Sequence, residues 1–507
     1  SPLTGTVGDC SVGGAMAFQL RRAGWAGIVF TGRSPKPCGL EVRDGKAGLV
    51  DATGLLGRDV PEIRSLLRGR GSVAVTGPAA DNGVLFASVM VDGAHAAGRN
   101  GLGLSFSRKN LKYVSVTGSG AVTVHDPARL ERACEQIYRL MASSPVIMGG
   151  FGLRNMGTGA LYDLVHARGM MPTANFRRTR FDAAPGMNAP ALRKLLGASR
   201  SGCAGCRILC KKTGSEGVHV PEFETMSHFS ALLENDHLPT VVEANAVCNR
   251  TGMDTISAGA TLACHAEITG RRLSPREIPA LLEDIASGRM PSLAQGSRRY
   301  AAAEGMPRAS MSVKSLELPA YDPRGAYGMA LAYAVSTRGG CHLRAYPISH
   351  EILRKPVVTD RMSFSGKARI IKIAEDANAA IDSIGACKFC FFGASLEEYA
   401  EALSAVTGIE TGAHDLLHAG ERIYARERQM NTEFGFGRED DDLPARFFEE
   451  PGTSTEWMET PPLPRDGFLE ALGRYYRIRG LDEGGRLLSG KAAELGLDGD
   501  PGAEDPL

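Results

Sequence analysis

The sequence predicts an α+β fold with a β-sheet domain first and two mainly α-helical domains after it. Two observations support this. Short β-branched runs bounded by glycine turns fill residues 1–125, and longer segments with helical spacing dominate the remainder. Because the strands precede the helices, separate domains are favoured over alternating β–α–β units. The 507 residues are also enough for several hydrophobic cores.

The first domain, residues 1–125, is expected to hold strands over residues 26–32, 72–77, 84–91 and 113–118. The chain opens on turn residues, "SPLTGTVGDC", without an initiator Met. We therefore expect the first segment of this domain to be missing, either cut from this chain or supplied by a partner chain.

The second domain, residues 126–312, is expected to begin with a helix at Asp126 or Pro127. Asp is a favoured N-cap residue, and Pro fits the first helical turn. A third domain, residues 313–507, carries further helical patterns such as 369–385 and 395–408.

Composition narrows the class of function. The net charge of +1 argues against a nucleic-acid partner, and no apolar run is long enough for a membrane span. Eleven cysteines without the spacing of a disulfide scaffold favour a reducing cytoplasm, with thiols free to bind metal.

Three cysteines, Cys203, Cys206 and Cys210, lie within eight residues. A zinc site would show a second close pair soon afterwards, yet the next cysteine is Cys248. An iron–sulfur cluster commonly takes three thiolates from one loop and a fourth from a distant segment, for which "DSIGACKFCFFG" offers candidates. The alternative is that the three thiols pack as small apolar groups.

The chain also resembles the aldehyde:ferredoxin oxidoreductase family of tungsten enzymes over nearly its whole length. The resemblance depends on these blocks: "SPLTG" with "GGAMAFQLRRAGWAGIVFTGRSPKP", "DGAHAAGRNGLG", "CAGCRILC", "PEFET", "GMDTISAG", "LELPAYDPRGAYG", "TRGGCHLRAY" and "DSIGACKF". It implies a tungsten (or molybdenum) bis-pterin between the domains, a Mg²⁺ ion bridging the pterin phosphates, and a [4Fe–4S] cluster beside one pterin. The implied cluster ligands are Cys203, Cys206, Cys210 and Cys387, with Cys390 as a neighbour.

The resemblance also implies the residues around the cofactor. Arg99, in a glycine-rich loop, would meet a pterin phosphate, while Asp382 would bind one pterin. The second pterin would meet Asp254 and Asn249, where Asn replaces the usual Asp and gives up its charge. Ser11 and Gly13 would underlie the cofactor.

Glu224 and His342 are the catalytic residues that the resemblance implies, as proton acceptor and as hydrogen-bond donor to a carbonyl oxygen. Without the resemblance, a Glu near a helix start would be read as a cap and a lone His as structural. In "LELPAYDPRGAYG", Asp322 and Arg324 form either a cavity-lining loop or an internal ion pair.

The resemblance implies oxidation of a small aldehyde to a carboxylic acid, with electrons passing through the cluster to ferredoxin or to an iron–sulfur partner subunit. Two alternatives stay open. One is a subunit of an aromatic thioester (benzoyl-CoA type) reductase, which shares the cysteine pattern. The other is an iron–sulfur electron-transfer scaffold without the pterin.

Overall fold

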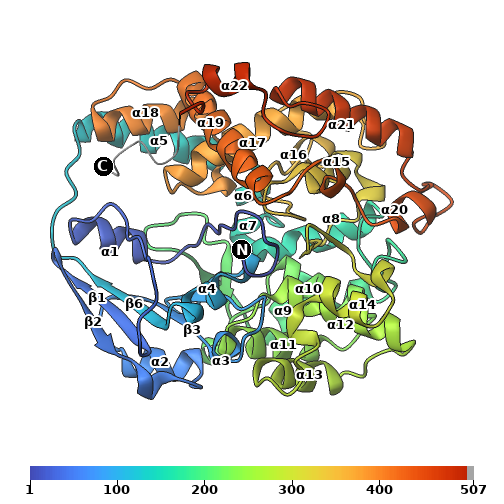
Figure 1. The fold of residues 1–507 in the computed structure, drawn as a ribbon, viewed down its shortest axis with the longest axis horizontal. Coiled ribbons are helices and arrows are strands. Elements are labelled where there is room, and N and C mark those ends of the chain that lie inside the picture. Colours follow the sequence, from blue (N-terminus) through green and yellow to red (C-terminus); the bar gives the residue numbers. More distant parts are fainter. Residues whose placement is uncertain (500–507) are drawn as a thin grey trace.

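The computed structural model describes residues 1–499, and it confirms the α+β class (Figure 1). One six-stranded sheet, of order β2-β1-β6-β3-β4-β5, lies in the N-terminal region. Strands β1 and β6 are parallel, and the other neighbours are antiparallel. The strands are β1 (Cys38–Arg43), β2 (Lys46–Asp51), β3 (Ser72–Thr76), β4 (Val89–Val91), β5 (His95–Ala97) and β6 (Leu111–Thr117).

Both faces of this sheet are covered, because its strand β3 is buried along its whole length. Val73 belongs to a small core completed by α2 (Val60–Leu66). Ala74 belongs to a second core, on which α1 (Met16–Arg22) and α4 (Leu102–Arg108) pack. Successive residues of one strand point to opposite faces, so β3 serves both cores.

Two of the expected strands differ from the structure. Residues 26–32 form no strand: Ile28 and Phe30 pack on the sheet core, while Val29 between them is 89% exposed. This segment therefore contacts the sheet through side chains rather than through backbone ladder bonds. Of residues 84–91, only the last three form a strand.

The helical part begins with α5 (Pro127–Ser143), where it was expected, and Asp126 accepts the Arg129 N–H as its cap. Helix α5 packs on α18 (Leu396–Thr407), which is far away in sequence (Figure 1). The other helices of seven or more residues are α8 (Leu161–Ala167), α9 (Ala189–Leu196), α10 (Phe223–Phe229), α11 (Leu238–Thr251), α12 (Thr255–Thr269), α13 (Glu277–Ala286), α14 (Ser297–Ala303), α15 (Tyr327–Val335), α17 (Lys367–Ser383), α19 (Ala413–Glu433) and α21 (Arg465–Arg479).

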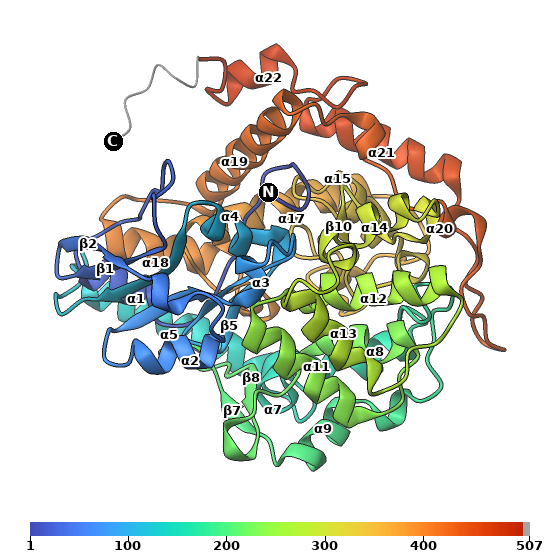
Figure 2. The same ribbon diagram turned by 60° about the horizontal axis from the view of Figure 1, so that its bottom comes forward.

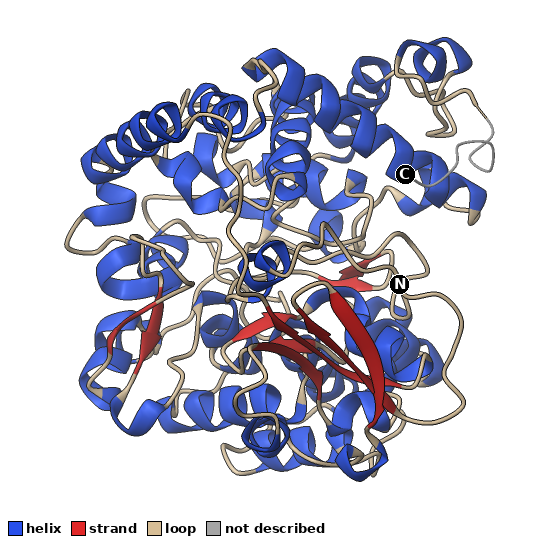
Figure 3. Ribbon diagram, turned by 90° about the vertical axis from the view of Figure 1, so that its left-hand side faces the viewer, coloured by secondary structure: helices blue, strands red, loops and turns tan. Residues whose placement is uncertain are grey.

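Short elements join these helices. They include α3 (Pro78–Asp81), α6 (Pro145–Met148), α7 (Leu153–Met156), α16 (Ile348–Glu351), α20 (Arg446–Glu449), α22 (Ser489–Glu494) and the hairpins β7 (Ser199–Ser201) with β8 (Lys211–Thr213) and β9 (Ser312–Val313) with β10 (Leu316–Glu317). Figure 3 shows the large sheet in the lower half of a mostly helical molecule.

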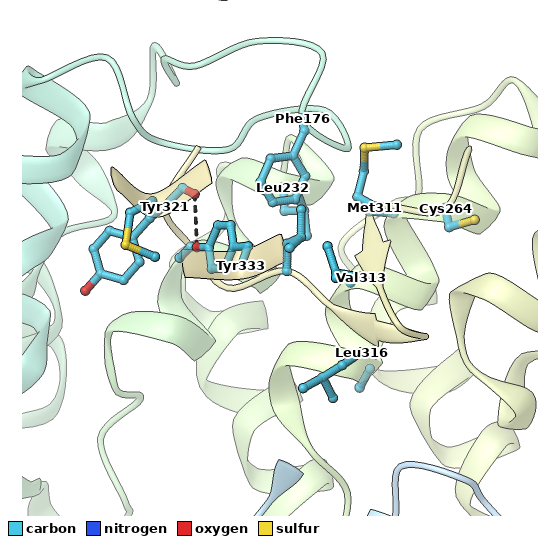
Figure 4. Packing of buried hydrophobic residues seen from close by; sticks show 14 of the residues in the cluster. Phe176, Leu232, Cys264, Met311, Val313, Leu316, Tyr321 and Tyr333 are labelled. Carbon is cyan, nitrogen blue, oxygen red and sulfur yellow. Dashed lines mark hydrogen bonds between the residues drawn. The ribbon is translucent and has the colours of Figure 1, made fainter. Parts of the chain in front are cut away.

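A continuous apolar core holds the helical part together and reaches the first residues of the chain through Leu3. Its members include Phe176, Leu232 and Tyr333 (Figure 4). Within residues 1–499, every helix is too short or too polar to serve as a membrane span. The last eight residues of the expected third domain lie outside the described part.

Candidate functional site

Arg99 lies in a tight turn between β5 and α4. Asn100 and Gly101 both have left-handed backbone (φ 65° and 70°), and a Cβ on Gly101 would collide with the Leu85 carbonyl oxygen. The Arg99 Nη2 donates to Glu317 O at 2.6 Å. Its Nε and Nη1 are buried and have no hydrogen-bond partner among the described residues. The Nε atom lies 3.3 Å from the Asp254 carboxylate without a hydrogen bond, and Nη1 has no such neighbour within residues 1–499, so this side of the guanidinium suits an anion such as a phosphate.

Asp254, 3.3 Å from Arg99 Nε, already has a structural role. Its carboxylate caps α12 by accepting the N–H groups of Ile256 and Ser257. Asn249 is half-buried in the last turn of α11, and we find no side-chain hydrogen bond for it within residues 1–499. Pterin binding by these two residues is still a prediction. Asp254 already accepts hydrogen bonds from the backbone of α12, whereas Asn249 has none to its side chain among the described residues.

Glu224 and His342 lie next to each other, although they are distant in sequence. Glu224 is in the first turn of α10, and His342 lies between α15 and α16. The Glu224 Oε1 and His342 Nε2 atoms are 3.5 Å apart. The other carboxyl oxygen accepts the Ala320 N–H at 2.8 Å, while Oε1 has no hydrogen-bond partner among the described residues. One carboxyl oxygen is thus available beside an imidazole, as an acid–base pair requires.

Burial alters the protonation of both residues. It raises the pKa of Glu224 to about 8, because a buried carboxylate loses its hydration. It lowers the pKa of His342 well below its usual range, and the positive charges of Arg99 and Arg338 act in the same direction. At neutral pH His342 is therefore a neutral imidazole.

An aromatic wall adjoins this pair. The ring centroids of Tyr321 and Tyr346 lie 5.6 and 6.2 Å from that of His342. The Tyr333 hydroxyl donates to Tyr321 O at 3.1 Å and fixes the backbone there (Figure 4). Aromatic surface next to an acid–base pair suits an uncharged organic group.

Ser11 and Asp382, both predicted to contact the cofactor, are hydrogen-bonded to each other. The Ser11 hydroxyl donates to Asp382 Oδ1 at 2.5 Å, and Lys388 Nζ lies 2.6 Å from the other carboxyl oxygen. The structure therefore joins the N-terminal segment to the end of α17 at this point. Lys388 was not predicted, since its part in the site depends on that long-range contact.

The three clustered cysteines lie on the loop between β7 and β8, beside α7 and α9 at one end of the molecule (Figure 2). Gly13 lies directly against this loop. A Cβ on Gly13 would be 2.5 Å from Cys203 Sγ and 2.8 Å from His95 Nδ1. The predicted cofactor floor and the predicted cluster loop thus touch.

Cys387 comes just before the short helix Lys388–Phe392, close to the same loop. The segment's Cys390 and Phe392 share a small apolar core with Cys206 and Cys210. Burial raises the pKa of Cys210 to about 12, with further contributions from the Glu222 carboxylate and the Cys387 thiol. Soft sulfur donors gathered from two segments fit an iron–sulfur cluster. No three His, Cys, Asp or Glu side chains within residues 1–499 are already arranged as a metal-ligand set, so the ligand assignment is still a prediction.

Gly13→Ala is expected to displace the cysteine loop, because the new methyl group would overlap Cys203 Sγ. We expect the iron bound per chain to fall by at least half, with a lower thermal unfolding midpoint. Gly27→Ala is the matched control, since nothing lies within 4 Å of a Cβ there. Equal iron content in the two variants would contradict the contact.

Cys341, Arg338 and Arg344 also lie at the site, and the sequence did not predict a role there for any of them. Cys341 is buried, and its sulfur accepts N–H groups from Leu343 and from Arg338 at 2.9 to 3.2 Å. The adjacent guanidinium groups of Arg338 and Arg344 hold the pKa of this thiol below its usual range. Arg338 also donates to Asp9 O at 2.7 Å, which ties the N-terminal segment to the His342 loop. No local sequence pattern predicts these contacts, because they join residues that are far apart in the chain.

Asp322 and Arg324 form an internal ion pair, which is one of the two arrangements expected for this loop. Arg324 Nη2 and Asp322 Oδ2 are 2.6 Å apart, and both side chains are fully buried. Arg324 further donates to Phe176 O at 2.5 Å. The pair therefore stabilises the segment that carries Tyr321.

Known families match this chain over nearly all its length. The model described as aldehyde ferredoxin oxidoreductase, N-terminal domain, matches residues 1–118. The model described as aldehyde ferredoxin oxidoreductase, domains 2 and 3, matches residues 132–497.

Among characterised relatives is a tungsten-containing aldehyde ferredoxin oxidoreductase from Thermococcus kodakarensis, 36% identical over 529 aligned residues that cover 98% of this chain and 86% of that protein. The protein of the same description from Pyrococcus furiosus is 35% identical with equal coverage. Among solved structures, the active-site complex BamBC of benzoyl coenzyme A reductase has a TM-score of 0.81 and 20% identity, covering 98% of this chain and 85% of that one. That last likeness concerns the fold.

Proposed function

Because this chain belongs to the aldehyde ferredoxin oxidoreductase family, we propose that it oxidises aldehydes to carboxylic acids. The observation that carries the proposal is the contact between Glu224 and His342, which lie 3.5 Å apart and both feel the charge of Arg99. The overall reaction consumes an aldehyde and water and yields a carboxylic acid, two protons and two electrons. A pair of residues that can hold a proton and donate a hydrogen bond suits this chemistry.

The family is tungsten-containing, and a tungsten or molybdenum bis-pterin would accept the two electrons when bound. The buried unused donors of Arg99 would hold a phosphate of that cofactor, near a bridging Mg²⁺ ion. Asp382, Asp254 and Asn249 would bind the pterin rings. Ser11 and Gly13 would lie beneath them, with Ser11 fixing the Asp382 carboxylate.

Glu224 acts as the base in its carboxylate form, which its pKa of about 8 makes the major form only above pH 8. In that form it takes the proton of the water that adds to the aldehyde carbon. His342 is neutral, so its N–H donates a hydrogen bond to the carbonyl oxygen, where negative charge develops. The rings of Tyr321 and Tyr346 hold the imidazole in place and exclude water from one side. The chain thereby orients the substrate and moves the proton.

The electrons would leave through a cluster at Cys203, Cys206, Cys210 and Cys387. The tip of the cysteine loop, Ala204 and Gly205, is exposed. Two arginines lie near that tip: Arg154 donates to Arg207 O, and the Arg207 guanidinium lies 3.8 Å from the Tyr138 ring centroid. A positive surface of this kind fits an acidic acceptor such as a ferredoxin or an iron–sulfur subunit.

Arg207→Glu is expected to raise the KM for an acidic ferredoxin about tenfold at low salt, because the reversed charge repels the acceptor. Turnover with a neutral redox dye should be unchanged. The exposed Arg298, on α14, gives the control variant Arg298→Glu. An equal KM for ferredoxin in both variants would place the electron exit elsewhere.

Anaerobic purification with elemental analysis tests the proposed function. About four irons with one tungsten or molybdenum per chain, and aldehyde-dependent dye reduction, are expected. Iron without tungsten or molybdenum would favour the electron-transfer scaffold. The resemblance of the fold to BamBC motivates a parallel assay with an aromatic coenzyme A thioester, and activity there alone would favour the reductase. None of the eleven cysteines, which all lie within residues 1–499, is paired in a disulfide, and this fits the cytoplasm.

A further inference from the structure

Glu317 is a fully buried glutamate in strand β10 whose side chain has no task in the proposed function. Its Oε1 atom accepts the Ser297 N–H at 2.9 Å and the Ser297 hydroxyl at 3.0 Å. Its Oε2 atom lies 2.7 Å from Ser257 Oγ, and that hydroxyl oxygen lies 2.8 Å from Asp254 Oδ2. A single buried serine hydroxyl therefore lies between two carboxyl groups.

This arrangement needs one more proton than two carboxylates and one hydroxyl supply. The Ser257 hydroxyl has a single O–H and can donate to only one of the two carboxyl groups. If both groups were ionised, the other contact would press oxygen lone pairs together at hydrogen-bond distance. A proton on one carboxyl group turns both contacts into hydrogen bonds, because that group donates to Ser257 Oγ while Ser257 donates to the other.

The contacts of the two carboxyl groups indicate which one carries the proton. Both oxygens of Asp254 accept backbone N–H groups at the start of α12, and Arg99 Nε lies 3.3 Å from Oδ2. N–H donors and a nearby cation favour a carboxylate. Among the described residues, Glu317 Oε2 has neither, and burial raises the pKa of Glu317 above its usual range. The proton therefore belongs on Glu317 Oε2.

We propose that Glu317 is a neutral carboxylic acid at pH 7 and a positioning residue of the cofactor site. Its Oε2–H donates to Ser257, whose hydroxyl donates to Asp254, so the Asp254 carboxylate is fixed beside Arg99. The Glu317 backbone oxygen also accepts Arg99 Nη2 at 2.6 Å, which holds the guanidinium from a second side. The positioning role rests on the proposed function, in which Arg99 and Asp254 bind the pterin cofactor. The assignment of the proton does not.

A neutral Glu317 also preserves the charge balance that an anion needs at this site. Arg99 and Asp254 together carry no net charge, and an ionised Glu317 would add a negative charge that repels a phosphate. The other ionisable group facing Glu317 from α12 is Cys264, which is neutral at pH 7 because burial raises its pKa to about 12. Helix α14 presents the hydroxyl of Ser297, and β9 pairs a serine with Glu317.

Infrared difference spectroscopy on the purified full chain tests the proton without depending on turnover. The spectrum of the unaltered chain minus that of Glu317→Gln should contain the carbonyl stretch of a carboxylic acid at pH 7. An ordinary glutamate, with a pKa of about 4.3, is ionised at that pH. Glu304→Gln, at an exposed glutamate where α14 ends, is the control and should give no such band. A carboxylate signal in the Glu317 difference spectrum at pH 7 would overturn the inference.

Metal content tests the positioning role. Glu317→Leu cannot donate to Ser257, so tungsten or molybdenum per chain should fall at least twofold. Glu317→Gln keeps an N–H donor of nearly the same size and should retain the metal. Equal metal content in these two variants would refute the positioning role. If the unaltered chain itself binds neither metal, the proposed function fails, and the infrared band still decides where the proton lies.

Discussion

Glu224→Gln is expected to reduce aldehyde turnover about 10³-fold, the largest effect we predict for any single catalytic side chain. The amide has the size of the carboxyl group and its oxygen can still accept the Ala320 N–H, so the local structure should persist. It cannot take a proton, and it therefore cannot act as the base. Turnover is measured with a redox dye under anaerobic conditions.

Glu243→Gln is the control for that measurement, because Glu243 is an exposed residue on α11. Both variants should retain the iron content and the unfolding midpoint of the unaltered chain. Loss of iron in Glu224→Gln would show that the carboxyl group acts on the fold. Turnover within tenfold of normal, with cofactor intact, would remove Glu224 from the reaction.

Cys387→Ala is expected to lose most of the cluster, because a cubane held by three protein thiolates is readily stripped. Iron per chain should fall from about four to less than one, and the visible absorption of the cluster should vanish. The same loss should stop electron transfer to ferredoxin.

Cys390→Ala is the matched control for Cys387→Ala, because Cys390 lies three residues further on, in the short helix that Cys387 precedes. Cys390 packs in the apolar core with Ile208 and Phe392, so its loss should cost stability and leave the cluster in place. The opposite outcome, with iron lost from Cys390→Ala and kept in Cys387→Ala, would exchange the two assignments. Zinc in place of iron would end the cluster interpretation.

Local sequence patterns were sufficient for much of the helical fold. The first long helix begins at Pro127 with Asp126 as its cap, because that signal is confined to neighbouring residues. The sheet was harder. No strand was expected over residues 38–51, although the hairpin of β1 and β2 turns at Asp44 and Gly45, both with positive φ, and an Asp-Gly pair is a hairpin signal. Residues 26–32 have the composition of a strand but lie outside the ladder of hydrogen bonds.

The sequence by itself determined the family, the spacing of Cys203, Cys206 and Cys210, and the identity of Glu224 and His342 as the pair to examine. Tertiary structure alone decided which of these side chains meet. It placed Glu224 against His342, Ser11 on Asp382 and Gly13 on Cys203, and it set Ser257 between Glu317 and Asp254. The reason is physical: periodicity and capping depend on neighbours along the chain, whereas contacts and burial depend on how distant segments pack.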